Sequence, residues 1–278
     1  MAAMSPTGSE VPAPAPERPR VAVVTGGGAG IGRAAARRLA AEGWTVVVAG
    51  RTGATLEASC DRPGMHPVVA DVTSDGSVAA LFEAAGALGE VRLCLVNAGV
   101  PGPVAEFGDL APAEFADTVA VNLTGAFRTA AAAFRAMRDQ DPPGGRIIVN
   151  ASIAAQVPRP RSAAYAASKA GLAGLTRVLA LDGRAHGIAA TRLDVGNAAT
   201  GLLAGFGVAG ADPAPGTRTP PGEEGPGALQ PDGSHLVEPS FDVAEVARAV
   251  CYLAALPAEA TVDQLTLTAA GMPFLGRG

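Results

Sequence analysis

The chain has few of the residues that build disulfide frameworks or metal sites. Its 278 residues include only three cysteines and three histidines. Cys60, Cys94 and Cys251 are odd in number, lie in or beside apolar segments and form no CxxC motif. These features exclude a disulfide framework and indicate free, buried thiols in a reducing cytoplasm. Because histidine and cysteine residues do not cluster in the sequence, we expect no metal site.

Long apolar runs and basic stripes are missing too. No apolar segment approaches the roughly 18 residues that a membrane-spanning helix needs, and the N-terminus lacks the basic and apolar regions of a signal peptide. We therefore expect a cytoplasmic protein without a membrane partner. The net charge is −5, of which residues 211–239 carry −4 and residues 1–20 carry none. The remaining body, at −1, offers no basic stripe to a nucleic acid.

Hydrophobic residues, in contrast, make up 48% of the chain, enough for one large core in a single α/β domain. Two irregular segments hold twelve of the 23 prolines. The first predicts a disordered N-terminal tail over residues 1–19, because it has no apolar period and is rich in proline. The second, residues 201–240, contains seven prolines and nine glycines. Within a domain spanning residues 20–278, such a segment is typical of a mobile substrate lid.

Between these segments, short apolar stretches alternate with longer helical patterns. This alternation predicts an α/β fold: a single-domain, Rossmann-type, doubly wound parallel sheet flanked by helices, with ligands at the C-terminal ends of the strands. We expect strands at residues 21–24, 45–49, 68–70, 93–96, 146–150, 189–194 and 264–268. We expect helices at residues 33–40, 78–87, 112–137, 163–186 and 243–255.

A glycine-rich turn joins the first strand to the first helix. Residues 25–32 read TGGGAGIG, with the spacing G-x-x-x-G-x-G over Gly26, Gly30 and Gly32. Glycine permits positive φ angles and close backbone approach, and the helix N-terminus offers N–H donors to a pyrophosphate. The spacing differs from the standard G-x-G-x-x-G dinucleotide fingerprint. Glycine is abundant in this chain, so a chance cluster is the alternative, but the position between strand and helix favours a dinucleotide site.

A second pattern places three catalytic residue types in order. Tyr165 and Lys169 are four residues apart, so a helix puts both side chains on one face. A lysine cation favours the phenolate and lowers the tyrosine pKa towards the working range. Ser152, thirteen residues before the tyrosine, adds a hydroxyl to the same site. By itself, Tyr-x-x-x-Lys is more often an exposed helical pair.

Taken together, the motifs resemble those of the short-chain dehydrogenase/reductase family. The resemblance covers residues 20–278 and rests on an ordered series: the turn at 25–32, Asp71-Val72, Asn97-Ala98-Gly99, Asn122, Ser152 and Tyr165-x-x-x-Lys169. It implies an oxidoreductase that transfers a hydride between a nicotinamide cofactor and a carbonyl or secondary alcohol. It also implies a homodimer or homotetramer.

The resemblance assigns a role to each matching residue. Tyr165 exchanges a proton with the substrate oxygen, Ser152 hydrogen-bonds the same oxygen, and Lys169 binds the nicotinamide ribose. Asn122 bends its helix and holds a water that leads to the lysine. Cofactor contacts are implied for Gly26, Gly28, Gly30, Ile31, Gly32, Arg51, Asp71, Val72, Asn97, Ala98, Gly99, Tyr165, Lys169, Asn197 and Thr200.

Several of these residues have simpler alternatives. Asp71, expected to bind the adenine amino group, could instead cap the helix that begins near residue 73. The Asn97-Ala98-Gly99 segment, expected to line the adenosine side, could be a plain turn. Asn122 could be a solvated polar residue, since asparagine is unfavourable inside helices. Ser152 could be a helix or turn cap.

The end of the second strand indicates the coenzyme. NAD-binding sites place an acidic residue about twenty positions after the glycine turn, to bind the ribose 2′-hydroxyl. Here Gly50 and Arg51 follow that strand, and the next carboxylate is Glu57. A guanidinium also suits a 2′-phosphate. We therefore predict NADP(H) as the cofactor, with NAD(H) and a non-catalytic cofactor-binding protein as alternatives.

One segment departs from the family pattern, and the substrate is not encoded in any motif. Val195-Gly196 stands where the family has Pro-Gly, which puts the rigidity of this loop in question but removes no hydrogen-bond donor. Arg159 and Arg161, after Ser152, could pair with a substrate carboxylate but are more often solvated on such a loop. Apolar lid residues suggest a hydrophobic or mixed substrate, namely Leu202, Leu203 and Phe206.

Overall fold

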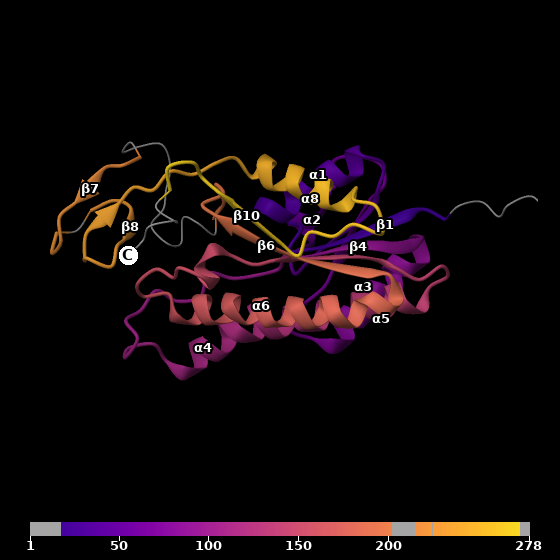
Figure 1. Cartoon of the computed structure of the whole chain (residues 1–278), viewed down its shortest axis with the longest axis horizontal. Helices are drawn as coiled ribbons and strands as arrows, with labels where there is room; N and C mark the ends of the chain where they lie inside the picture. Colours follow the sequence, from indigo (N-terminus) through magenta and orange to yellow (C-terminus); the bar gives the residue numbers. More distant parts are fainter. Residues whose placement is uncertain (1–17, 202–214, 224, 273–278) are drawn as a thin grey trace, which may run out of the picture.

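The computed structural model describes residues 18–201, 215–223 and 225–272. Seven parallel strands form one sheet in the order β10-β6-β5-β4-β1-β2-β3, with helices on both faces (Figure 1). In this part of the chain no helix has both the length and the apolar character needed to cross a membrane. The predicted doubly wound parallel sheet is confirmed. Of the predicted tail, only Arg18 and Pro19 are among the described residues. The Arg18 guanidinium donates to the Gly86 carbonyl, and the Pro19 carbonyl accepts from the Glu90 N–H.

The strands are short and almost wholly apolar because both faces of the sheet are covered. In β1, Val21 and Val23 point into one core, whereas Ala22 and Val24 point into the other. The strands are β1 (Arg20–Thr25), β2 (Thr45–Gly50), β3 (Met65–Val69), β4 (Glu90–Val96), β5 (Gly145–Asn150), β6 (Ile188–Gly196) and β10 (Gln264–Thr268).

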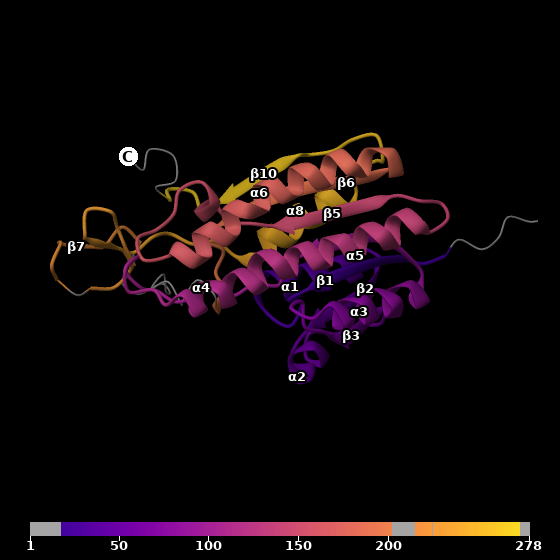
Figure 2. The same cartoon turned by 90° about the horizontal axis from the view of Figure 1, so that it is seen from below.

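The helices divide between the two faces. On one face lie α1 (Gly30–Ala41), α2 (Gly53–Glu57) and α8 (Val243–Ala254). On the other lie α3 (Asp75–Leu88), α4 (Pro112–Val119), α5 (Gly125–Asp139) and α6 (Ala163–Gly183). There α5 and α6 run side by side across the sheet (Figure 2). The short helix α2 was not predicted, because five residues are too few to show a helical period.

The helix expected over residues 112–137 is interrupted. Between α4 and α5, residues Ala120–Thr124 form a π-helical turn, in which the backbone bonds span one residue more than in an α-helix. The turn contains Asn122. A π-helical turn has no apolar-period signature, so the sequence could not predict it.

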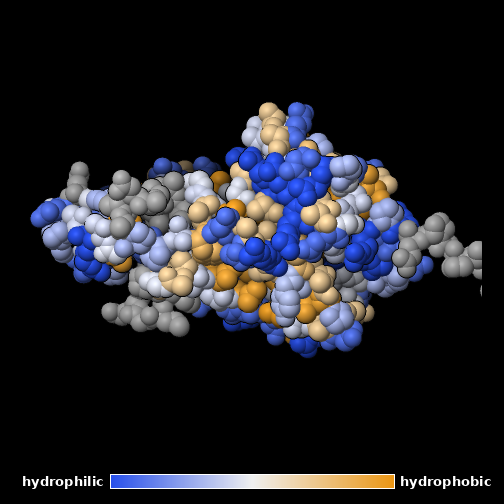
Figure 3. Space-filling view, turned by 90° about the horizontal axis from the view of Figure 1, so that it is seen from above, coloured by the Kyte–Doolittle hydropathy of each residue, from blue (hydrophilic) through white to orange (hydrophobic). Residues whose placement is uncertain are grey.

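Part of the segment expected to be an irregular lid is a small sheet. Residues 202–214 and 224 of that segment lie outside the described residues. Strands β7 (Arg218–Thr219), β8 (Ala228–Leu229) and β9 (His235–Leu236) pair antiparallel in the order β7-β9-β8. This 215–240 unit projects from one end of the molecule (Figures 1 and 3). The prediction of an irregular loop is wrong here, because two-residue strands are too short to give a period in a proline-rich sequence.

Candidate active site

Two adjoining cavities lie at the C-terminal ends of the strands, where the strand order reverses between β1 and β4. In doubly wound sheets this switch point is the usual ligand site. The larger cavity has a volume of about 410 Å³ and the smaller about 130 Å³. Both are lined by Gly26 and Gly99.

The glycine turn forms one wall of the larger cavity. Gly26 and Gly30 have φ angles of +66° and +48°, a region that favours glycine. At Gly32, a Cβ atom would lie 2.2 Å from the Gly26 carbonyl oxygen, so a side chain there would push the turn away from α1. Gly26, Gly30 and Ile31 line the cavity. Gly28 lines neither cavity and packs against Thr55 instead.

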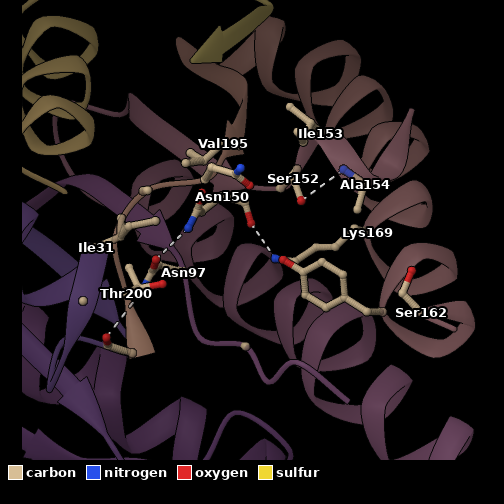
Figure 4. Close-up of a pocket in the computed structure, with 18 of the residues that line it drawn as sticks. Ile31, Asn97, Asn150, Ser152, Ile153, Ala154, Ser162, Lys169, Val195 and Thr200 are labelled. Carbon is tan, nitrogen blue, oxygen red and sulfur yellow. Dashed lines mark hydrogen bonds between the residues drawn. The ribbon is translucent and has the colours of Figure 1, made fainter. Parts of the chain in front are cut away.

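The Asn97-Ala98-Gly99 loop is fixed to the glycine turn by hydrogen bonds. The Asn97 and Ala98 backbone N–H groups donate to Thr25 Oγ1 at 3.0 and 3.2 Å. Asn97 Nδ2 donates to the Thr25 carbonyl at 2.9 Å, and Asn97 Oδ1 accepts from Asn150 Nδ2 at 2.7 Å (Figure 4). The segment therefore aligns the ends of three strands in addition to turning the chain. Asn150 was not singled out from the sequence, because its role depends on this pairing across strands.

The smaller cavity brings together the residues predicted for the adenosine end. Gly50, Arg51, Asp71, Val72 and Ala98 all line it. Asp71 Oδ1 accepts hydrogen bonds from the backbone and hydroxyl of Thr73, and these bonds lower the pKa of the carboxyl.

The helix α3 is capped by another residue. The Ser74 hydroxyl accepts from the Ser77 N–H, so the alternative that Asp71 caps this helix is wrong.

Asn122 is buried, with 1% of its surface exposed, and the alternative of a solvated side chain is wrong. Its amide forms a paired contact with the backbone of Val100: Oδ1 accepts at 2.8 Å and Nδ2 donates at 2.9 Å. Nδ2 also lies 3.2 Å from Ser168 Oγ on α6. The π-helical turn directs this amide across to the loop after β4, so it connects three elements.

Ser152, Tyr165 and Lys169 are buried in the wall of the larger cavity. Tyr165 and Lys169 lie one turn apart on α6, with Lys169 Nζ 5.7 Å from the centroid of the tyrosine ring. Lys169 Nζ donates to the Asn150 carbonyl at 2.9 Å (Figure 4). Ser152 Oγ accepts from the Ala154 N–H at 3.1 Å and is also hydrogen-bonded to Tyr165, so capping and a place beside the tyrosine coexist.

Burial governs the protonation of this pair. It raises the pKa of Tyr165, and the bond with Ser152 and the Arg159 charge only partly oppose it. Burial also lowers the pKa of Lys169 to about 8, against an opposing effect of the Asp194 carboxylate. The expectation that lysine lowers the tyrosine pKa is therefore not met by these groups. The physical reason is that desolvation disfavours both charged forms at once.

Arg159 is held by residues from two distant segments. Its Nη2 forms an ion pair with Glu238 and donates to Asn197 Oδ1 at 2.8 Å, while Asn197 Nδ2 donates to Glu238 at 2.8 Å. The Arg159 side chain is 16% exposed and that of Glu238 0%, so the expectation of a solvated arginine is wrong for Arg159. Arg161 is 48% exposed and pairs with Glu106 at the surface.

Val195 and Gly196, expected in a loop, end strand β6, and the loop that follows them is fixed without the missing proline. Asn197, at φ +59°, and Thr200 both line the larger cavity. Two backbone hydrogen bonds join the loop to Phe241. The Ala199 N–H donates to the Phe241 carbonyl at 2.8 Å, and the Phe241 N–H donates to the Asn197 carbonyl at 3.1 Å. No local sequence signal marks Glu238, because it is 41 residues from Asn197.

A doubly wound parallel sheet with a glycine turn at its switch point is typical of nucleotide-binding α/β proteins. Comparison with known families narrows this class. A family model described as short chain dehydrogenase matches residues 20–207, more than half of the chain. The chain belongs to this family of oxidoreductases.

Named relatives share part of the sequence. Cis-4-hydroxycyclohexanecarboxylate dehydrogenase of Sinomonas cyclohexanicum is 38% identical over 193 residues, covering 67% of this chain and 76% of the relative. The NAD(+)-dependent 2-dehydro-3-deoxy-L-rhamnonate dehydrogenase of Sphingomonas sp. (strain SKA58) is 33% identical, covering 63% and 70%.

Solved structures extend the likeness to most of the fold. An actinorhodin polyketide ketoreductase variant with NADPH superposes with a TM-score of 0.75 at 30% identity, covering 90% of this chain and 96% of the other. The 3-ketoacyl-(acyl-carrier-protein) reductase of Brucella melitensis, complexed with NADH, also gives 0.75, at 24% identity and 91% and 98% coverage. The second likeness supports the fold alone.

Proposed function

We propose that the protein transfers a hydride between NADP(H) and a carbonyl or secondary-alcohol substrate. The observation that carries the proposal is the placement of Ser152, Tyr165 and Lys169 in one cavity wall, opposite the glycine turn. A hydroxyl, a phenol and an ammonium around a cavity can bind an oxygen and exchange a proton with it. No side chain supplies a hydride, so a bound nicotinamide would provide it.

The residues present fit such a cofactor. Gly26, Gly30 and Ile31 leave an open cradle at the start of α1, where the N–H groups suit a pyrophosphate. The smaller cavity beside Asp71 and Val72 suits the adenosine. Five further predicted contacts line one or both cavities, whereas Gly28 and Gly32 line neither; the five are Asn97, Ala98, Gly99, Asn197 and Thr200.

Each catalytic side chain then has a defined task. The Tyr165 hydroxyl gives its proton to the carbonyl oxygen in reduction and takes it back in oxidation. Ser152, bonded to the tyrosine, donates to the same oxygen. Lys169 supplies positive charge beside the phenol and a donor for the nicotinamide ribose, while Asn122 holds the loop after β4 against α6.

The preference for NADP(H) rests on the end of β2. Gly50 and Arg51 line the smaller cavity, and the only carboxylate among its described lining residues is Asp71. No ion pair engages Arg51 among the described residues. Its exposed guanidinium is free to meet a 2′-phosphate. The relative that uses NAD(+) keeps NAD(H) as the alternative.

A carbonyl panel tests the proposal. Cyclic ketones belong in it, because relatives are named for cis-4-hydroxycyclohexanecarboxylate and levodione. We expect at least one ketone to consume NADPH, followed as loss of its near-ultraviolet absorbance. Silence across ketones, aldehydes and the reverse reaction with alcohols, while NADPH still binds, would favour a non-catalytic cofactor-binding protein.

We also propose a cytoplasmic homodimer or homotetramer. Exposed apolar side chains gather on the outer surfaces of α5 and α6, including Phe127, Val178 and Leu181. Two such helical faces can bury each other in a symmetric contact. Sedimentation velocity would measure the assembly, and a purely monomeric protein would contradict it.

A further inference from the structure

The larger cavity contains one cation that the proposed chemistry does not use. Among the described residues that line it, only Lys169 and Arg159 carry charge, and none is acidic. Lys169 is committed to the Asn150 carbonyl and the tyrosine. Arg159 stands on the loop that follows Ser152, and its charge reaches Tyr165. It is therefore close to the reacting centre yet has no step in the reaction.

Arg159 is fixed at both ends. Its carbonyl accepts from the Ser162 hydroxyl at 2.7 Å, which ties the loop to the start of α6. Its Nη2 is bound by Glu238 and Asn197, and Glu238 in turn accepts from Gln230 at 3.2 Å. Glu238 is fully buried and is not among the described residues that line the cavity. The carboxylate thus anchors the guanidinium from behind, on the side of the 215–240 unit.

The anchored guanidinium keeps an unused donor. Its Nε atom is buried and has no hydrogen-bond partner among the described residues. A buried N–H without an acceptor is costly, and native proteins rarely leave one. Because Nη2 is already bound by Glu238 and Asn197, Nε is the donor that can give a carboxylate oxygen one charge-assisted hydrogen bond.

We propose that Arg159 binds a carboxylate on the substrate, away from the reacting carbonyl, and that Glu238 and Asn197 position it for this task. The inference rests on the proposed function and names its substrate class: oxo acids and the corresponding hydroxy acids. Glu238 balances the arginine charge, so recognition comes from the directed Nε–H group, and the gain is that of one charge-assisted hydrogen bond, about tenfold or more.

The test compares oxo acids with their neutral methyl esters, each pair having the same chain length between the ketone and the carboxyl group. 4-Oxopentanoate, 5-oxohexanoate and 6-oxoheptanoate, with their esters, are assayed with NADPH and titrated calorimetrically into the enzyme saturated with NADP⁺. We expect at least one acid to exceed its ester about tenfold in kcat/KM and in affinity. Arg159→Met should remove this preference, because it lowers kcat/KM and affinity for the acids more than for the esters. Arg161→Met, two residues away on the same loop, should keep it.

Wild-type enzyme that favours the esters, or Arg159→Met that keeps the acid preference, overturns the inference. If Arg159→Met does not fold because Glu238 is left unpaired, Arg159→Gln/Glu238→Gln removes both charges and retains amide hydrogen bonding. Failure of the proposed function is distinct, because then no compound is turned over. The calorimetric comparison of acids and esters still decides the role of Arg159.

Discussion

Tyr165 illustrates how burial sets the properties of a single residue. Its phenol is protonated over the whole neutral range, because desolvation raises its pKa. A protonated phenol next to Ser152 is ready to donate in the direction of carbonyl reduction. In the oxidative direction Tyr165 must take a proton from the alcohol, which requires the phenolate form. A positive charge stabilises the phenolate, and Lys169 is the nearby cation.

Replacing Tyr165 by phenylalanine removes the proposed proton donor and little else. We expect the fold and cofactor affinity to persist and turnover to fall by several decades, each worth about 1.4 kcal/mol of transition-state stabilisation. Steady-state kinetics and a cofactor titration measure both. The other tyrosine in the chain, Tyr252, is exposed on α8, so Tyr252→Phe is a matched control. A Tyr165→Phe rate above about a tenth of wild type would rule out its role.

The proposed coenzyme preference rests on two residues at the end of β2, Gly50 and Arg51. We expect Gly50→Asp to shift kcat/KM towards NADH, because a carboxylate binds the 2′-hydroxyl and repels a 2′-phosphate. Arg51→Ala should weaken NADPH selectively. A Cβ at Gly50 would lie 3.2 Å from Leu56 Cδ2, so Gly50→Ala controls for crowding. A wild-type enzyme with the higher kcat/KM for NADH would contradict the NADP(H) proposal.

At the scale of elements, the π-helical turn between α4 and α5 gives Asn122 its position. The turn is stabilised by the paired bonds with Val100, and a standard α-helix would rotate the amide away from that loop. The same amide reaches Ser168 on α6, next to Lys169. The element thus connects the loop after β4 to α6.

Asn122→Ala should therefore destabilise the protein by about 2 kcal/mol, since the Val100 N–H and carbonyl both lose their partner. Thr129→Ala on α5 is the comparison. This variant removes one hydrogen bond, from the Thr129 hydroxyl to the Gly125 carbonyl. Because that carbonyl also accepts a backbone bond of the helix, the loss of unfolding free energy should be smaller. Urea unfolding measures both values, and equal losses would mean that the paired contact with Val100 contributes no more than the single Thr129 hydroxyl bond.

The 215–240 unit differs from the lid that its composition suggested. Its described residues form a small sheet, and Glu238 connects it to Arg159 and Asn197 in the cavity wall. We still expect residues 201–240 to exchange amide hydrogens faster than the main sheet and to gain protection when cofactor and substrate bind. High protection already in the free enzyme would instead mean a fixed wall.

At the scale of the whole molecule, stability should depend on pH through Lys169. Its pKa is lowered by burial to about 8 from the ordinary value of 10.5. At a pH below the pKa of Lys169 in the folded state, the lysine is protonated in both the folded and the unfolded states. The folded protein then bears the full cost of a buried charge. Between the two values the unfolded chain binds more protons, so the unfolding free energy rises with pH.

The comparison with Lys169→Met isolates this effect. Relative to the variant, the wild-type unfolding free energy should rise by roughly 2 kcal/mol between about pH 7 and about pH 9.5. Cys251, whose pKa is raised to about 12 by burial, acts in the opposite sense above its ordinary value of 9.0, but it is common to both proteins. A constant difference across this range would contradict a buried, titrating Lys169.

The sequence by itself determined the architecture and the order of the motifs. Short β-branched strands such as Val21–Val24 can only be covered on both faces, and the glycine turn before α1 is a local requirement of backbone geometry. Tyr165 and Lys169 share a helix face through their spacing alone. These features depend on periods and conformational limits that act within a few residues.

Only the tertiary structure decided which distant residues meet. Asn150 aligns Asn97 with Lys169, and Glu238 anchors Arg159 from 79 residues away. Burial then reversed the expected direction of the Tyr165 pKa, because the cost of desolvation depends on the neighbours packed around a group and not on its place in the chain. Contacts and dielectric surroundings are properties of the folded whole, so no local pattern of residues could have specified them.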